Sequence, residues 1–157
     1  VNNLGGGDAP GMEAVWDGLL RAGKRVYGIA VDDAHYFKRP WDPLAPKPGR
    51  GWVVVRAPRL EAGALLASLE AGDFYASTGV ELEAYAADAA GIHVRVRQDG
   101  QTRHRLTLVD ATGDVHTQDG PDVRFPLTGL KGYARVVVRD SNGHQAWTQP
   151  IFLDGRP

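Results

Sequence analysis

An aspartate and a histidine, Asp33 and His35, stand two residues apart directly after an apolar run, and both residue types bind metal ions. If the backbone stays extended, side chains two residues apart leave on the same side of the chain. A carboxylate and an imidazole in that arrangement could share one divalent metal ion. An Asp after a strand is also a common turn residue or helix cap, so the spacing alone leaves a purely structural role open.

The element expected to position this pair is the apolar run from Val26 to Val31. Its β-branched and aromatic residues predict a short strand buried on both faces in a mostly parallel sheet. In α/β folds ligands bind beyond the carboxyl ends of strands, so polar residues at this exit are candidate site residues. A helix is predicted before the run, with an apolar face made of Met12, Val15, Trp16, Leu19 and Leu20.

Further elements after the pair extend the α/β pattern. The sequence predicts strands over residues 52–56 and 73–78, with a helix over residues 60–71 between them. Residues 1–80 are too few for a complete β/α barrel, which takes on the order of 200 residues. They would therefore need missing strands, a second copy or the following domain to close their core.

Four stretches of the sequence resemble the C-terminal part of the PHP (polymerase and histidinol phosphatase) family; these are residues 26–37, 48–55, 72–80 and 146–152. Members of this family are metal-dependent phosphoesterases on a distorted β/α barrel, and their last metal-binding motif is an Asp-x-His after a late strand. The segment Asp33-Ala34-His35 is similar to that motif at both ligand positions. The fourth stretch looks like the closing segment of bacterial members that carry a small C-terminal β-domain.

The resemblance implies that Asp33 and His35 hold a metal ion, with Asp32 as a hydrogen-bond acceptor that orients His35. Divalent ions such as Zn, Mn, Fe or Mg would lower the pKa of a bound water and promote its attack on a phosphate ester. Ser77 and Thr78, at another strand end, could contact that substrate. Their alternative role is to satisfy main-chain groups at the turn that follows.

The other metal-binding motifs that the resemblance implies are missing from the sequence. The chain has no His-x-His, and four further histidines are expected to be exposed without a ligand role: His93, His104, His116 and His144. Because catalytic zinc sites take three protein ligands, we expect the isolated chain to be inactive or nearly so. The first residue is Val1 and the only methionine lies in a predicted helix, which indicates a piece of a longer protein. The implied partners are the remainder of the barrel or another subunit.

The hydrophobic pattern changes to a period of two after residue 80. Apolar residues alternate with polar ones around residues 92–96, 123–127 and 134–138, and turn signals such as Asp99-Gly100 and Asn142-Gly143 separate the runs. This pattern predicts an Ig-like antiparallel β-sandwich. The expected fold class is thus mixed α+β, with residues 1–80 as the end of a β/α barrel and residues 81–157 as the sandwich.

The charge, hydropathy and cysteine content of the chain limit which partners are expected. A net charge of -1 gives no electrostatic reason to expect nucleic acid. No apolar stretch approaches the roughly 20 residues that cross a bilayer, so no membrane partner is expected, and a cytoplasmic or exported location stays open. The absence of cysteine excludes disulfides and thiolate-bound metals. The alternative function is a non-catalytic binding or structural β-sandwich in which Asp-x-His is a relic.

Overall fold

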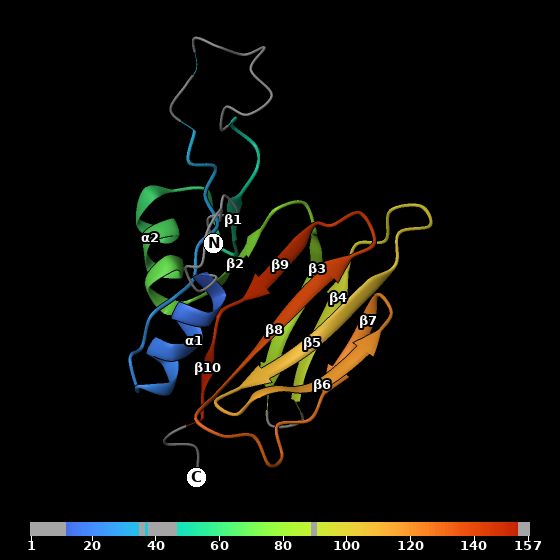
Figure 1. The fold of residues 1–157 in the computed structure, drawn as a ribbon. Coiled ribbons are helices and arrows are strands. Elements are labelled where there is room, and N and C mark those ends of the chain that lie inside the picture. Colours follow the sequence, from blue (N-terminus) through green and yellow to red (C-terminus); the bar gives the residue numbers. More distant parts are fainter. Residues whose placement is uncertain (1–11, 35–36, 38–46, 89–90, 154–157) are drawn as a thin grey trace.

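The computed structural model describes residues 12–34, 37, 47–88 and 91–153, which form two helices and ten strands (Figure 1). The helices are α1 (Met12–Arg21) and α2 (Ala62–Ala71). The strands are β1 (Trp52–Val55), β2 (Phe74–Ser77), β3 (Leu82–Asp88), β4 (Gly91–Val96), β5 (His104–Asp110), β6 (Gly113–Asp119), β7 (Asp122–Phe125), β8 (Tyr133–Asp140), β9 (Gln145–Thr148) and β10 (Ile151–Phe152). No helix in these ranges is long and apolar enough to cross a membrane.

Two antiparallel sheets form the body of the molecule. The large sheet has the order β1-β2-β9-β8-β5-β6, with β10 also paired to β8, and the small sheet has the order β3-β4-β7. Figure 1 shows the sheets facing one another, with both helices on the outer side of the large sheet near β1, β2 and β10. The antiparallel β-sandwich predicted from the period-two pattern is confirmed.

The core between the sheets comes from the alternation seen in the sequence. Ile92, Val94 and Val96 of β4 point inward and are at most 2% exposed. They meet inward side chains of the large sheet in one cluster, including Leu106 of β5 and Val136 of β8. Because successive strand residues face opposite sides, the apolar set of each strand fixes its register against its neighbours.

Elements from the first half of the chain belong to the same large sheet. The predicted strands at residues 52–56 and 73–78 are confirmed as β1 and β2, and the predicted helix at 60–71 as α2. β2 pairs antiparallel with β9, with Tyr75 opposite Thr148, so the sheet continues across the domain boundary predicted at residue 80. The expectation of a mostly parallel sheet is wrong for the described residues, because every strand pairing among them is antiparallel.

A buried ion pair attaches α1 to the outer face of the large sheet. The Asp17 carboxylate accepts hydrogen bonds from Arg135 Nε at 2.9 Å and Nη2 at 2.7 Å, and from the Tyr133 hydroxyl at 2.9 Å. The Arg135 side chain is 1% exposed and its guanidinium lies 4.7 Å from the centre of the Trp16 ring. Such a bidentate pair fixes the orientation of the helix as well as its position.

Candidate functional site

The segment that leads to Asp33 is extended but is not a strand, so the strand predicted over residues 26–31 is wrong. Two of its residues, Val26 and Gly28, bond side chains through their main-chain groups. Gly28 N–H donates to Gln149 Oε1 and Gly28 C=O accepts from Gln149 Nε2, both at 2.8 Å. Trp16 Nε1 donates to the Val26 carbonyl at 3.1 Å. The side-chain amide of Gln149 thus bonds Gly28 where the prediction had a neighbouring parallel strand.

Only one face of this segment is covered. Ala30 is 3% exposed, whereas Tyr27, Ile29 and Val31 are 39%, 53% and 46% exposed. The prediction of burial on both faces is therefore also wrong for this structure. Large apolar side chains on an extended segment are usually covered when the fold is complete, which makes this face a candidate contact surface.

Asp32 organises the loop opposite the segment. Its carboxylate accepts hydrogen bonds from the main-chain amides of Gly49 at 3.0 Å, Arg50 at 2.5 Å and Gly51 at 2.8 Å. The Gly51, Arg50 and Gly49 amides stabilise the ionised form and lower the pKa of Asp32 below 3.8. The carboxylate predicted to orient His35 thus makes three bonds to the loop.

Asp33 is exposed and adopts the left-handed conformation, with φ of 55°. Non-glycine residues at positive φ are uncommon, and among them Asp and Asn are enriched. The extended backbone that would place the side chains of residues 33 and 35 on the same side is therefore not present at Asp33. His35 lies outside the described residues, and the metal site formed by Asp33 and His35 stays a prediction.

The hydroxyls of Ser77 and Thr78 bond the main chain. Ser77 is fully buried; its Oγ donates to the Val80 carbonyl at 2.7 Å and accepts from the Gly79 amide at 3.0 Å. Thr78 Oγ1 accepts from the Gln145 amide at 2.9 Å. These contacts agree with the alternative role at the turn, and the burial of Ser77 removes its hydroxyl from a substrate.

One of the four remaining histidines differs from its expected exposure. His93 pairs with Asp122 at 2.6 Å and His144 with Asp140 at 3.1 Å, both near the surface. His104, by contrast, is 6% exposed, so its predicted exposure is wrong. The signal was present in the sequence, because two-residue spacing places position 104 on the inward face with Leu106 and Leu108. In the part of the chain that the structure describes, no group of three or more metal-binding side chains comes together.

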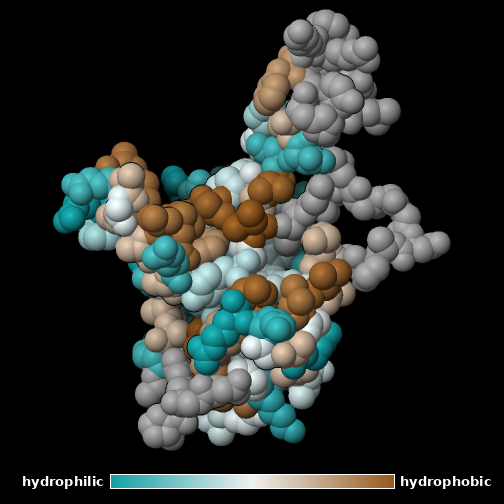
Figure 2. Space-filling view, turned by 90° about the vertical axis from the view of Figure 1, so that its left-hand side faces the viewer, coloured by the Kyte–Doolittle hydropathy of each residue, from teal (hydrophilic) through white to brown (hydrophobic). Residues whose placement is uncertain are grey.

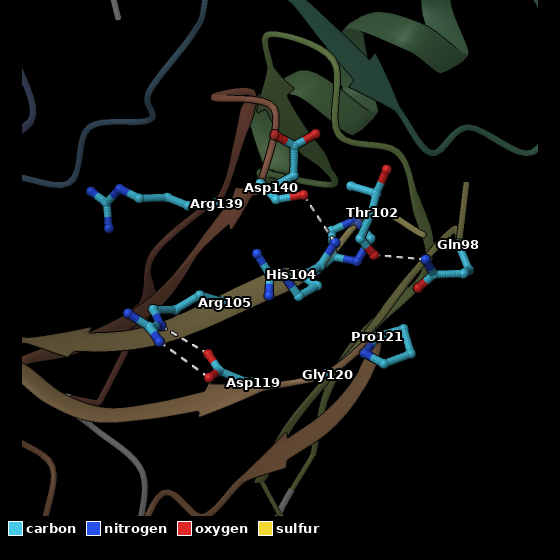
Figure 3. A pocket seen from close by; sticks show the side chains of 11 residues that line it. Gln98, Thr102, His104, Arg105, Asp119, Gly120, Pro121, Arg139 and Asp140 are labelled. Carbon is cyan, nitrogen blue, oxygen red and sulfur yellow. Dashed lines mark hydrogen bonds and ion pairs between the residues drawn. The ribbon is translucent and has the colours of Figure 1, made fainter. Parts of the chain in front are cut away.

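A second candidate site lies at one end of the sandwich. A cavity of about 820 Å³ is lined by residues of the β4–β5 loop, of β5, of β6 and its following turn, and of the end of β8 (Figure 3). Three arginines and the buried His104 line it. Sequence reasoning missed this site, because its residues are brought together by strand register and carry no spacing motif.

Comparison of the chain with protein-family models, with curated proteins and with solved structures gives no significant match.

Proposed function

We propose that this chain is the C-terminal portion of a PHP-type metal-dependent phosphoesterase, in which Asp33 and His35 contribute the last two ligands of a metal cluster. The proposal depends on the motif resemblance of residues 26–37, 48–55, 72–80 and 146–152. A bound divalent ion would supply an activated water and stabilise charge on the phosphoryl group. The chain's own contribution is to hold the carboxylate and the imidazole at the exit of the segment that Gln149 and Asp32 anchor.

The structural observation behind this proposal is the distribution of exposed apolar residues along the chain. In the described ranges every exposed large hydrophobic residue lies at or before Leu66: Met12, Val15, Leu19, Tyr27, Ile29, Val31, Phe37, Trp52, Val54, Leu60 and Leu66. Figure 2 shows apolar residues gathered on the side of the molecule that carries both helices. A domain that needs further chain to cover this side predicts this distribution, but the antiparallel pairing of β1 with β2 and of β2 with β9 is not that of a parallel β/α barrel.

The first test measures metal content. A form of the protein extended at its N-terminus is purified, and its bound Zn, Mn and Fe are determined by mass spectrometry. Asp33→Ala and His35→Ala are expected to lose metal, because each removes one ligand. His116→Ala, a change at an exposed histidine on β6, is the matched control and should retain it. Equal metal content in all four proteins would support the relic-motif alternative.

The second test measures hydrolysis. With added Mn²⁺ or Zn²⁺, the extended form should hydrolyse p-nitrophenyl phosphate or bis(p-nitrophenyl) phosphate, and residues 1–157 alone should not. The difference is expected because two protein ligands are too few for a catalytic metal site. Comparable turnover by residues 1–157 would contradict the incomplete-site proposal, and no turnover by either form would favour a binding module.

A further inference from the structure

The cavity at the end of the sandwich has an excess of positive charge. Arg103 reaches it from the β4–β5 loop, Arg105 from β5 and Arg139 from β8. Arg105 and Arg139 stand directly opposite one another in the β5–β8 register, which places two like charges on one face of adjacent strands. Like charges so placed repel unless an anion lies between or beside them.

The two carboxylates that line the cavity, Asp119 and Asp140, already accept hydrogen bonds from protein groups. Asp119 accepts from Arg105 Nε at 2.8 Å and Nη2 at 3.1 Å, as Figure 3 shows. Asp140 accepts from the Asn142 and His144 amides at 2.8 Å and 2.7 Å and contacts the His144 ring at 3.1 Å. Hydrogen bonds from these groups outweigh burial and keep the pKa of Asp140 below 3.8.

Arg103 and Arg139 have N–H donors that no carboxylate of the cavity occupies. Arg139 is half exposed, and its nearest carboxylate is Glu13 of α1, at 3.5 Å. No carboxylate of the described residues forms an ion pair with Arg103, although its charge also acts on Asp119 and lowers the pKa of that group. The guanidinium groups of Arg103 and Arg139 are thus the donors that an incoming anion would meet.

His104 also borders the cavity, but its side chain turns to the inward face of β5 with Leu106 and Leu108, opposite to the face that carries Arg105 and Arg139. The Nδ1 atom of His104 is buried and has no hydrogen-bond partner within the described ranges. The residue opposite it on β8 is Asp140, whose carboxylate is already used as described above. Because the Nδ1 atom of His104 is enclosed by protein, it is not a contact point for a molecule in the cavity. Thr102, Ser141 and Gln98 add hydroxyl and amide groups around the same space.

We propose that this cavity binds the oxyanion group of a small organic molecule, a phosphate ester or a carboxylate, through Arg103 and Arg139. The planar guanidinium group matches both oxyanions with two parallel hydrogen bonds. A volume of about 820 Å³ is large enough for a molecule of monosaccharide size. No phenylalanine, tyrosine or tryptophan is among the described residues that line the cavity, so a neutral sugar would lack a large ring to stack on.

Calorimetric titration of the protein with glucose 6-phosphate, glucuronate and neutral glucose tests this site. We expect heat of binding with at least one of the two anions, weakened by added salt, and none with glucose. Arg103→Gln should weaken binding by about tenfold or more, because it removes charged hydrogen bonds to the anion. Arg95→Gln, on the outer face of β4 and outside the cavity, is the matched control and should leave the affinity unchanged.

Binding of glucose 6-phosphate alone would identify the ligand as a phosphate ester, and binding of glucuronate alone would identify it as a carboxylate. Absence of binding by both anions up to millimolar concentration would overturn the proposal. Equal weakening by Arg103→Gln and Arg95→Gln would overturn it as well, because binding would then reflect overall charge. Neither result depends on the Asp33 and His35 metal site, so the two proposals fail separately.

Discussion

Replacement of Asp17 by alanine should destabilise the protein strongly through the buried partner it leaves behind. The change removes two hydrogen bonds to Arg135 and one to the Tyr133 hydroxyl. Arg135 is 1% exposed, and its Nη1 already has no partner in the described ranges. Removing one partner of a buried pair costs about 3–5 kcal/mol. Since Glu13 remains 3.6 Å from Arg135 Nη2, we expect the lower end, about 3 kcal/mol.

Urea denaturation followed by tryptophan fluorescence measures this change, with Trp16 directly beside the pair. The melting temperature should fall by about 6–12 °C. Asp119→Ala is the matched control, because Asp119 binds Arg105 with similar geometry. Both side chains of that pair are about two-thirds exposed, so its loss should lower the free energy of unfolding by less than about 1 kcal/mol. Adding Arg135→Met to Asp17→Ala should recover much of the loss. Equal effects of Asp17→Ala and Asp119→Ala would refute this reasoning.

Three further changes test other contacts. Gly28→Ala should lower the free energy of unfolding by about 1–3 kcal/mol in urea denaturation, because a Cβ there would lie 2.8 Å from the Trp16 indole ring. Gly18→Ala, where a Cβ would have no atom within 4 Å, should stabilise α1 slightly. Ser77→Ala should lower stability by about 1–3 kcal/mol, and an unchanged stability would show that its buried bonds contribute nothing. Burial raises the pKa of Asp110, but bonds from Thr112 outweigh it and keep the pKa below 3.8. Asp110 should therefore stabilise the fold above that pH and lose its contribution as the pH falls, and Asp110→Asn should flatten acid denaturation.

Local patterns in the sequence predicted both helices and the strands β1, β2, β4, β7 and β8, but they did not single out β3, β5, β6 or β9. The alternation of Ile92, Val94 and Val96 placed β4 correctly, because one buried face fixes a period of two. The run at residues 26–31 was misassigned since its composition suits a strand, while its actual partner, the Gln149 amide, is far away in the sequence. The cavity at the sandwich end escaped notice because Arg105 and Arg139 become neighbours only through strand register.

The bond between Gly28 and Gln149 joins residues 121 positions apart, and this separation has a consequence during synthesis. A ribosome adds about 5–20 residues per second, so Gly28 waits on the order of 6–25 seconds for this partner to be made. β2 waits similarly for β9, its neighbour in the large sheet. Asp32 can bond the loop at residues 49–51 soon after that loop is made, whereas Gly28 stays without its partner until Gln149 follows, and a translation arrest before Gln149 leaves this part of the segment exposed to proteases.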